Sequence, residues 1–455
     1  MERYEIDWRS PLAAFAPLAG RDGAILLHGG DAAVDARWSF IVAAPQRTIV
    51  SIDGRTILDG APICGSPFDA LSRIHRERRH SAGSDCLSPL VSGLVGFCGY
   101  ECGGFCEPTA RGPSSPYGLP DFWFGAYDAV AAFDRLAGKA CLYGRSAAAL
   151  DALSSSLGSG DPPPPARKHF DAPESNFSRE AYCKAVRELR EKIGNGDLFQ
   201  ANISQRLEAR ARAPIDAFAL FADVARASAS GFGACFALNG VSVISQSPER
   251  FFAVRPGDAG RFKITAEPVK GTRPRGATPH EDAVMRAALI ADPKDRAENI
   301  MIADLTRNDL SKICDDGTIF EDSICEAVSY ANVHHLASRI SGRLRTDINA
   351  ADALGALFPC GSITGAPKVE AMKAIAEIEQ AGRGPYCGAI GYIDDRGGAD
   401  FSVAIRIAIV EERRLSVPVG GGVTLRSEPE AEYEETLTKA RQFLHLAGVK
   451  NRAVP

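Results

Sequence analysis

The C-terminal segment 429–447 carries three polar residues whose spacing suits metal or anion binding. If this segment is a helix, Glu432, Glu435 and Lys439 fall together on one face. Two carboxylates placed in this way are ligands for a hard divalent cation such as Mg²⁺, which prefers oxygen and usually keeps several waters. The lysine beside them would hold an anionic substrate. A solvated helix face with a Glu435–Lys439 ion pair explains the same spacing. The apolar side chains of the opposite face are Tyr433, Leu437, Ala440 and Leu444.

A second acidic helix is expected at 295–312. Its Glu298 falls on a stripe of apolar residues that would face inward. An acid in that setting needs a partner, because an unpaired buried charge is costly. Arg296 or Arg307 would supply an ion pair, and a metal shared with Glu435 is the alternative.

Two glycine-bearing segments could bind an anion through the backbone. Residues 361–368 (GSITGAPK) run into an expected helix, whose free N–H groups and dipole favour negative charge. Residues 419–424 (VGGGVT) follow an expected strand, and three glycines let the backbone approach a ligand closely. A capped turn and a flexible hairpin, respectively, are the simpler interpretations.

Glu249 and Lys270 are candidates for acid–base and nucleophilic chemistry. Glu249 lies in SPER (247–250) and Lys270 in EPVKGTRPRG (267–276), at the ends of expected strands. Burial would raise the pKa of Glu249, as a general acid requires, and would lower the pKa of Lys270, as a nucleophilic amine requires. Ion pairs at strand ends are the alternative for both residues.

The elements that must position these residues indicate an α+β protein. Residues 199–207 alternate strictly, with Gln200 and Asn202 on a polar, amide-rich face. His334 and His335 would face opposite ways in a strand, so only one of them can point into a site. Further strands are expected at 241–246, 386–393 and 401–410, and helices at 280–291, 295–312, 366–381, 429–447 and from Ser178 to about Gly194. Few β-α alternations occur, which favours antiparallel sheets with helices outside.

The composition excludes several classes of protein. The 455 residues are 45% apolar and 24% charged, with a net charge of −5, which is ordinary for a globular protein. This charge balance argues against a nucleic-acid partner, and no apolar run is long enough to predict a membrane span. The 12 cysteines are scattered, which favours reduced thiols in the cytoplasm. Cys98, Cys102 and Cys106 lack the Cys-x-x-Cys spacing typical of metal sites.

A break in composition divides the chain. Residues 146–175 include four consecutive prolines at 162–165, which exclude a helix or a central strand. We interpret 146–175 as a linker between an N-terminal region, 1–145, and a longer C-terminal region, 176–450.

Taken together, the motifs resemble the chorismate-utilising enzymes: anthranilate synthase large subunits, aminodeoxychorismate synthase component I, and isochorismate and salicylate synthases. The resemblance covers nearly the whole chain. The matching segments, in chain order, are GDLFQANISQR, SPERFF, EPVKGTRPRG, DRAENIMIADLTRNDL, VHHLASRI, FPCGSITGAPK, GAIGYI, FSVAIRIA, GGGV and EAEYEETLTKAR. The resemblance implies an α+β fold of two interlocked subdomains, which form a β-sandwich-like core of large antiparallel sheets with helices packed outside.

The resemblance also implies a role for each matching residue. Glu298 and Glu435 would bind Mg²⁺ directly, and Glu432 would contact it through a water molecule. The metal would bind the ring carboxylate of chorismate. Glu249 would protonate the departing 4-hydroxyl. The residues that would line the ring pocket or hold the carboxylates are Thr364, Gly365, His335, Arg406, Lys439 and the backbone of Gly420, Gly421 and Gly422.

Two positions distinguish the branches of the family. Isochorismate- and salicylate-forming members resemble a pattern with a water-activating lysine where this chain has Gln200. Anthranilate synthases typically read PIAGT where aminodeoxychorismate synthases read PIKGT, and this chain reads PVKGT, with Lys270 in the variable place. The resemblance thus implies an aminodeoxychorismate synthase component I of 4-aminobenzoate and folate biosynthesis, with Lys270 as a covalent nucleophile. Anthranilate synthase component I is the alternative enzyme. A non-catalytic regulator that binds chorismate or an amino acid is the alternative of another class.

The resemblance bears on partners as well. No Cys-His-Glu glutaminase triad is apparent, so ammonia would come from a separate glutamine amidotransferase subunit. Many tryptophan-binding relatives read Leu-Leu-Glu-Ser or Leu-Leu-His-Ser near the N-terminus, whereas residues 26–30 here read LLHGG, without the serine. The following Arg37 and Trp38 match. A regulatory amino-acid pocket would therefore be formed by His28, Arg37 and Trp38, with tryptophan left open as its ligand.

Overall fold

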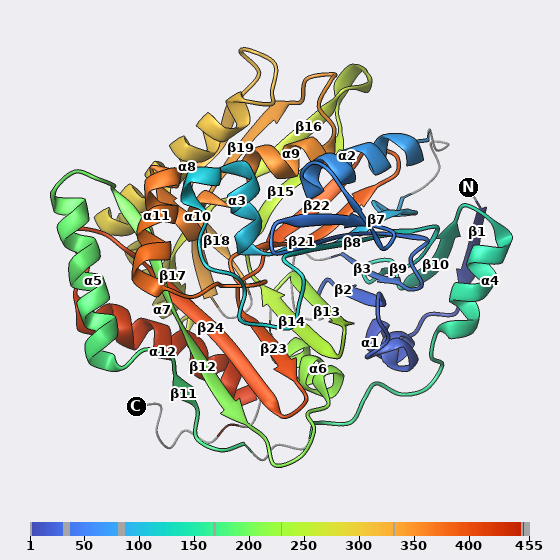
Figure 1. Ribbon diagram of the computed structural model, residues 1–455, viewed down its shortest axis with the longest axis horizontal. Coiled ribbons are helices and arrows are strands. Elements are labelled where there is room, and N and C mark those ends of the chain that lie inside the picture. The colour runs from blue at the N-terminus through green and yellow to red at the C-terminus, as the bar shows by residue number, and fades with distance from the viewer. Residues whose placement is uncertain are drawn as a thin grey trace.

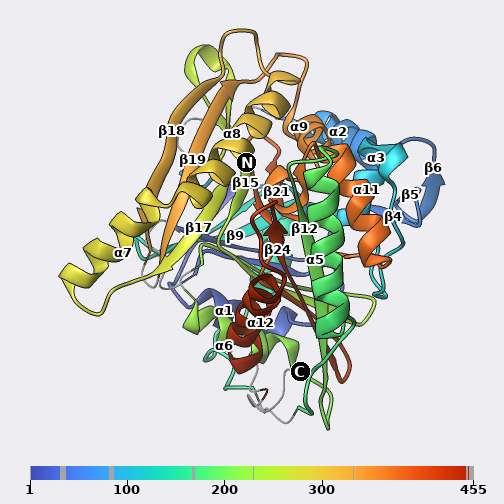
Figure 2. The ribbon, with the colours of Figure 1, turned by 90° about the vertical axis from the view of Figure 1, so that its left-hand side faces the viewer.

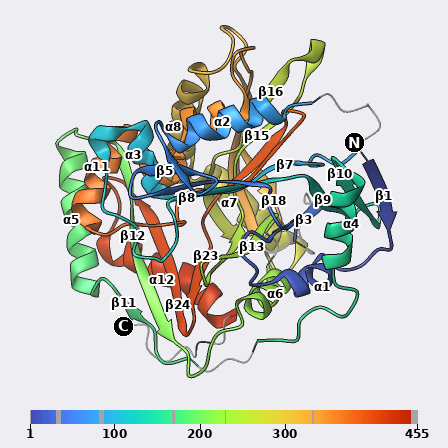
Figure 3. The same ribbon diagram turned by 45° about the vertical axis from the view of Figure 1, so that its right-hand side comes forward.

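The computed structural model contains two large antiparallel sheets packed against each other, with helices outside (Figure 1). Helices α5 and α12 lie at one end of the molecule, and β1 and α4 lie at the other (Figure 3). The α+β architecture expected from the sequence is confirmed. The residues that the structure describes are 2–30, 37–80, 87–166, 170–228, 230–330, 333–446 and 449.

The first sheet carries the strands that approach α5 and α12. Its strands in spatial order are β1 (Glu2–Ile6), β10 (Lys139–Gly144), β9 (Ala129–Asp134), β3 (Trp38–Val42), β2 (Ile25–His28), β13 (Phe232–Leu238), β14 (Val241–Ser247), β23 (Ile407–Glu411), β24 (Arg414–Val423), β12 (Gln200–Arg210) and β11 (Glu174–Ser175), with β20 (Gly365–Ala366) also paired to β12.

The second sheet has a similar width. Its strands in spatial order are β17 (Val269–Pro274), β19 (Val333–Arg343), β16 (Phe262–Ala266), β15 (Arg250–Pro256), β22 (Ala399–Val403), β21 (Ala389–Asp394), β7 (Gly93–Cys98), β8 (Phe122–Tyr127), β4 (Arg47–Ile52), β5 (Arg55–Leu58) and β6 (Ala61–Ile63), with β18 (Phe320–Ser329) also paired to β19.

The helices cover the outer faces of both sheets. Tyr182, Phe221 and Tyr433 from three of these helices share one apolar cluster with the outer face of the first sheet, and Figure 2 shows α5, α6 and α12 along that face. The helices are α1 (Pro11–Phe15), α2 (Pro67–Arg78), α3 (Gly103–Cys106), α4 (Ala147–Ser156), α5 (Arg179–Gly194), α6 (Ala217–Ala227), α7 (Pro279–Ala291), α8 (Pro293–Ser311), α9 (Ala350–Leu357), α10 (Gly361–Thr364), α11 (Lys368–Glu379) and α12 (Pro429–Leu446). Short 3₁₀ turns occupy Ala16–Leu18, Tyr100–Cys102, Pro108–Ala110 and Asp258–Gly260.

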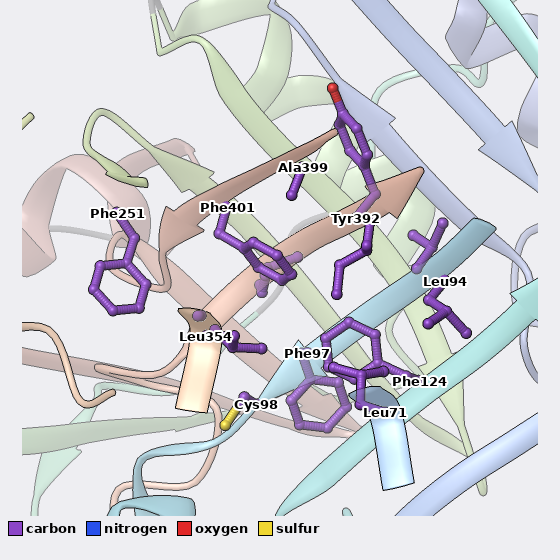
Figure 4. Packing of buried hydrophobic residues seen from close by; sticks show 14 of the residues in the cluster. Leu71, Leu94, Phe97, Cys98, Phe124, Phe251, Leu354, Tyr392, Ala399 and Phe401 are labelled. Atoms are coloured by element: carbon purple, nitrogen blue, oxygen red, sulfur yellow. The ribbon is translucent and has the colours of Figure 1, made fainter. Parts of the chain in front are cut away.

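Aromatic side chains fill the space between the sheets. Phe97 of β7 stacks on Phe236 of β13, with ring centroids 5.3 Å apart, and so joins the two sheets. In Figure 4, the side chains of Leu71 on α2 and Leu354 on α9 accompany the phenylalanines of the second sheet. Rings of this size dominate core energetics because each buries a large apolar area.

Both sheets contain strands from the two regions that the sequence separates. In the first sheet β2 pairs with β13, so that His28 lies opposite Gly233. In the second sheet β7 pairs with β21, so that Cys98 lies opposite Ala389. Residues 1–145 therefore supply the continuation of each sheet and share its core.

The structure corrects two sequence-based expectations. The linker predicted at 146–175 begins with a helix, α4, capped by the Ser146 hydroxyl, because the helix-breaking prolines start only at residue 162. The strand predicted at 401–410 is two strands, β22 and β23, since Arg406 between them has a φ of +53°. This interruption gives Arg406 a position that a regular strand would not provide.

Two further findings bear on the class of protein. No helix among the described residues is long and apolar enough to cross a membrane. Cys98, Cys102 and Cys106 carry free thiols, and all three donate to backbone carbonyls: Cys98 to Gly99, Cys102 to Asp121 and Cys106 to Gly355. These cysteines thus belong to the packing of the fold.

Candidate active site

The polar face of α12 lies over the glycine run of β24. The Lys439 ammonium pairs with the Glu435 carboxylate at 2.7 Å and donates to the Gly420 carbonyl at 2.8 Å. A Cβ on Gly421 would lie 3.2 Å from Glu432 Oε2, so a larger residue there would crowd the acid. Glu432 is only 4% exposed, whereas the Glu435 side chain that pairs with Lys439 is 52% exposed, so this face of the helix is buried at one end and open to solvent at the other.

The glycine run is part of a strand and not a flexible hairpin. Gly420, Gly421 and Gly422 lie opposite Ser204, Ile203 and Asn202 of β12. On its other edge β24 pairs with β23 only through residues 414–416. Within the described part of the chain, the glycines have no strand partner on that edge. Every second N–H group of the run therefore points where a carboxylate could accept it.

Helix α8 brings a second carboxylate to α12. Lys294 lies between them, with its Nζ 3.9 Å from Glu298 Oε1 and 3.7 Å from Glu432 Oε1. Burial raises the pKa of Glu298, although Lys270 and Lys294 oppose that shift. Burial likewise raises the pKa of Glu432. The predicted partners of Glu298 are wrong: Arg307 pairs instead with Asp304 and Glu321, and a lysine one turn back is the cation beside Glu298.

The donor set of this acidic cluster fits a hard cation such as Mg²⁺. All three acids offer carboxylate oxygen, and Glu298 Oε1 is buried with no hydrogen-bond partner among the described residues. Burial acts to raise the pKa of Glu435, but the charge and hydrogen bond of Lys439 outweigh it and lower that pKa. The three carboxylates do not yet form a close cluster, since no group of three metal-ligating side chains is gathered anywhere in the described residues. Lys294 instead lies where it neutralises Glu298 and Glu432 together.

Glu249, which is 5% exposed, and Lys270, which is half-buried, lie beside the turn that contains Ser362. The Lys270 ammonium donates to the Ser362 carbonyl at 3.0 Å. Burial lowers the pKa of Lys270, a shift that the charges of Glu298 and Glu249 oppose and that of Lys439 reinforces. Burial also raises the pKa of Glu249 to about 6, and Glu249 Oε1 has no hydrogen-bond partner among the described residues. Neither residue forms a salt bridge to a described residue, so the alternative of a strand-end ion pair fails.

The GSITGAPK segment forms one wall of the site and packs against β12. Thr364 is fully buried, and its hydroxyl donates to the Cys360 carbonyl at 2.6 Å. Gly365 has a φ of +143°, and a Cβ there would lie 2.1 Å from the Gln200 carbonyl, so only glycine fits. Gln200 is fully buried, with its Oε1 unpartnered among the described residues. A Cβ on Gly422 would meet the Gln200 side-chain amide at 2.5 Å, so Gly422 leaves room for this side chain and Gly365 for its backbone.

His335 and Arg406 line a cavity of about 100 Å³ at the other end of the site, together with Lys439. His335 Nδ1 lies 2.9 Å from the Thr272 hydroxyl, and burial lowers its pKa to about 4, which keeps the imidazole neutral near pH 7. His334 faces the opposite way and contacts Asp282 at 2.9 Å, as the strand alternation predicts. Burial lowers the pKa of Arg406, which is consistent with a guanidinium enclosed by protein.

Sequence reasoning missed several residues of this site. Asn202 donates to the same Ser362 carbonyl as Lys270, at 3.3 Å, and so ties β12 to the GSIT turn. Lys294 and Gln246 had no motif of their own. The alternation of β12 signalled Asn202, but only the fold places Lys294 between two acids and Gln246 in the wall of the cavity.

A larger cavity of about 400 Å³ lies between the sheets and is lined by His28, Arg37 and Trp38, among others. His28 is 2% exposed, and its Nδ1 accepts the Gly30 N–H at 3.0 Å. Arg37 pairs with Asp134 at 2.6 Å and lies over the Trp38 ring, 5.1 Å from the ring centroid. The three residues predicted to form an N-terminal pocket thus share one cavity.

Known proteins resemble this chain along nearly its whole length. The family model of the chorismate binding enzymes matches residues 24–445. Aminodeoxychorismate synthase component 1 of Klebsiella aerogenes is 35% identical over 452 residues, covering 97% of each chain. Anthranilate synthase component 1 of Mycolicibacterium smegmatis is also 35% identical, over 474 residues, covering 96% of this chain and 88% of the relative.

Solved structures share the fold. Anthranilate synthase component I from Streptococcus pneumoniae superposes with a TM-score of 0.77 at 28% identity, covering 90% of this chain and 93% of that one. The menaquinone-specific isochorismate synthase of Escherichia coli has a TM-score of 0.76 at 16% identity, with 98% and 94% covered, which shows the fold alone. The extent of the family match and the identity to both kinds of component 1 agree with the site geometry: this chain belongs to the chorismate-binding enzymes.

Proposed function

We propose that this protein is aminodeoxychorismate synthase component I, which converts chorismate and ammonia to 4-amino-4-deoxychorismate. The observation that carries the proposal is the environment of Lys270. This lysine is half-buried, desolvation lowers its pKa, and it lies beside a buried acid, Glu249, of raised pKa. An amine of lowered pKa next to a carboxyl of raised pKa is the pair that a covalent substitution requires.

In the proposed reaction, the unprotonated Lys270 amine attacks ring carbon 2 of chorismate. Both ring double bonds shift, from carbons 1–2 and 5–6 to carbons 1–6 and 4–5, the bond from carbon 4 to its hydroxyl breaks, and Glu249 donates the proton that lets the hydroxyl leave as water. Ammonia then adds at carbon 4, both double bonds shift back, and the bond between carbon 2 and the lysine nitrogen breaks. Glu249 is regenerated by the proton that ammonia releases. The enolpyruvyl group is untouched throughout.

Mg²⁺ belongs to the proposal as the group that would neutralise the ring carboxylate when bound. Glu298 and Glu435 would hold it, with Glu432 close by through water; the support is that Lys294 lies near both Glu298 of one helix and Glu432 of the other. The glycine run Gly420–Gly422 would offer N–H groups to the same carboxylate. Thr364, Gly365 and His335 would enclose the ring, with Gln200 at its edge, while Arg406 and Lys439 would bind the substrate's anionic groups.

Product analysis tests the proposal directly. The protein is incubated with chorismate, Mg²⁺ and ammonium at high pH, with and without an added aminodeoxychorismate lyase. We expect 4-aminobenzoate only when the lyase is present. Anthranilate fluorescence in the absence of the lyase would overturn the assignment.

Anthranilate synthase component I is the second candidate enzyme, because the relatives of that name reach the same 35% identity. It would require no covalent lysine, and Lys270 would then be a positioning cation. A non-catalytic regulator would bind chorismate but show no turnover with Mg²⁺ and ammonium, so the same assay separates all three.

A glutamine amidotransferase subunit is the proposed source of ammonia, since both similar relatives are named as component 1 of their enzymes. Addition of a candidate amidotransferase should let glutamine replace ammonium at neutral pH. Glutamine-dependent turnover by this chain alone would contradict the need for a partner.

We further propose that residues 1–145 form a regulatory and packing region and that the 400 Å³ cavity holds a free amino acid such as tryptophan. His28, Arg37 and Trp38 would contact it. Tryptophan titration followed by calorimetry, and by the rate of chorismate consumption, tests this role. If tryptophan does not bind at millimolar concentrations, the proposal that it is the ligand of this cavity is wrong.

A further inference from the structure

Gln246 is a buried amide whose hydrogen-bonding groups are both unmet. It is 3% exposed, yet neither its Nε2 nor its Oε1 has a hydrogen-bond partner among the described residues. Buried side-chain amides are almost always paired, because an unpaired polar atom loses its water without compensation. An unpaired amide in the wall of a cavity therefore points to a partner that enters from outside the protein.

The fold leaves room for this amide. Gln246 is a residue of β14 and lies opposite Gly233 of β13. A Cβ on Gly233 would lie 3.1 Å from Gln246 Nε2, so a larger residue in that position would crowd the amide. A buried strand of this kind would accept an apolar side chain at position 246 without an unmet polar group, so packing alone does not call for glutamine.

The charged side chains in the described lining of the cavity beside Gln246 are cations, of which Lys439 also pairs with Glu435. The cavity measures about 100 Å³, and its described lining includes Arg406 and Lys439 but no Asp or Glu. The neighbouring His335 is uncharged near pH 7, since burial lowers its pKa to about 4. The backbone N–H of Gln246 donates to the Arg406 carbonyl at 2.9 Å, so the two residues lie side by side on β14 and on the turn that leads into β23.

From these contacts we propose that Gln246 binds the carboxylate of the substrate's enolpyruvyl group, through its side-chain N–H, alongside Arg406. Chorismate carries two carboxylates, and the acidic cluster of α8 and α12 lies where a metal would take the ring carboxylate. The cationic cavity is left for the second one. This inference rests on the proposed use of chorismate. Gln246 would then be a specificity-determining residue, which favours chorismate over ring carboxylic acids that lack an enolpyruvyl group.

Substitution Gln246→Met tests the inference, because methionine has a similar length and volume but no amide. We expect the Kd for chorismate, measured by calorimetry with Mg²⁺ present, to rise about ten- to hundredfold, the effect of losing one hydrogen bond to a charged group. Binding of benzoate, which has a ring carboxylate only, should stay unchanged. The thermal midpoint should stay the same or rise, since an unmet polar group has been removed.

Ser245→Ala is the matched control. Ser245 is the preceding residue of β14, 1% exposed, with a hydroxyl that also lacks a partner among the described residues, but it does not line this cavity. Its loss should leave the Kd for chorismate within twofold. An unchanged chorismate Kd in Gln246→Met would overturn the inference, and so would a loss of stability in Gln246→Met with equal weakening of chorismate and benzoate, which would assign Gln246 to packing.

The outcome is separable from that of the proposed function. If the wild-type protein forms anthranilate, the proposed reaction fails, but both reactions use chorismate and the binding comparison still decides the role of Gln246. A Gln246→Asn variant keeps the amide on a side chain that is one methylene shorter. Its affinity for chorismate should lie between those of the wild type and Gln246→Met.

Discussion

The two cavities of this protein differ in how their polar groups are satisfied. In the 400 Å³ cavity between the sheets, five charged side chains of the wall pair with one another. Arg250 bonds to both Asp400 and Glu267, Arg255 also bonds to Asp400, and Arg339 bonds to Glu267. Around the smaller cavity and the acidic cluster, some buried polar atoms have no hydrogen-bond partner in the described part of the chain; these are Gln200 Oε1, Gln246 Nε2 and Oε1, Glu249 Oε1 and Glu298 Oε1.

This difference shows that size is a poor guide to the site of chemistry. A wall of paired charges is already satisfied and costs the fold little. Buried polar groups without hydrogen-bond partners destabilise the folded protein. Such groups are typically found where they bind a ligand or take part in a reaction. Substitutions on the unmet side should therefore impair function while sparing stability, and substitutions on the paired side should do the reverse.

The largest effect is expected from Lys270→Ala. Removal of the proposed nucleophile should lower kcat about 10³-fold or more and abolish a covalent chorismate adduct in intact-mass spectra. The thermal midpoint should not fall, because the amine that is lost is half-buried and forms no ion pair with a described residue. Lys263→Ala, at an exposed lysine paired with Asp322, is the control and should leave kcat unchanged. An adduct of unchanged abundance in Lys270→Ala would refute the nucleophile.

Glu249→Gln should lower kcat about 10²- to 10⁴-fold, the usual contribution of a general acid. In the wild type, kcat at saturating ammonia should decline progressively as pH rises above about 6, where Glu249 loses its proton, so turnover in the ammonia assay at high pH should be slower but still measurable. The free energy of unfolding should also fall as pH rises. The pKa of Glu249 is raised from 4.5 to about 6 on folding, so between these pH values the folded state holds a proton that the unfolded state releases. The free energy of unfolding should therefore decrease by up to about 1.4 kcal/mol per pH unit in this range.

Chemical denaturation of wild type and Glu249→Gln at several pH values measures this slope. The variant should lack the part of the decline that Glu249 causes. Identical slopes between pH 4.5 and 6 in the two proteins would mean that the folded environment does not raise the pKa of Glu249.

A smaller effect is expected from Lys294→Met. Its ammonium lies near both Glu298 and Glu432 and would compete with Mg²⁺ for them. Because Lys294 is partly exposed, the Kd for Mg²⁺ should fall only about two- to fivefold, as measured by calorimetry. Lys312→Met is the control. Lys312 follows the C-terminal end of α8 and pairs with Asp309, so its loss should leave the Kd for Mg²⁺ unchanged. Weaker Mg²⁺ binding in Lys294→Met would show that the lysine supports the metal site.

The smallest effect on catalysis is expected from Arg37→Ala on the paired side. Its ion pair with Asp134 is partly exposed, so the free energy of unfolding should fall by less than about 1 kcal/mol. The value of kcat/KM for chorismate should change less than twofold without an amino-acid ligand. A large loss of kcat/KM would place the larger cavity in the catalytic machinery and end the contrast between the two.

Much of the fold and of the site could be predicted because the signals are local. The Ser178 cap and the apolar stripe that follows it in the sequence predict α5. As expected of a cap, Ser178 Oγ accepts the Ala181 N–H at 3.1 Å. The i, i+3 and i+4 spacing of α12 similarly places Glu432, Glu435 and Lys439 on one face. Arg406 was expected in a continuous strand and lies instead at a break with positive φ, which no neighbouring residue signals.

The sequence by itself determined the antiparallel α+β character, the identity of the candidate acids and lysines, and the family, because periodicity and motifs depend only on neighbours along the chain. The tertiary structure decided which of these residues lie together. It placed Lys294 between acids of two helices and put Gln246 beside Arg406 in a cavity without acids. It also left some buried polar atoms unmet while pairing others. Those outcomes depend on burial and on contacts between residues far apart in the chain, so they follow only from the packed sheets.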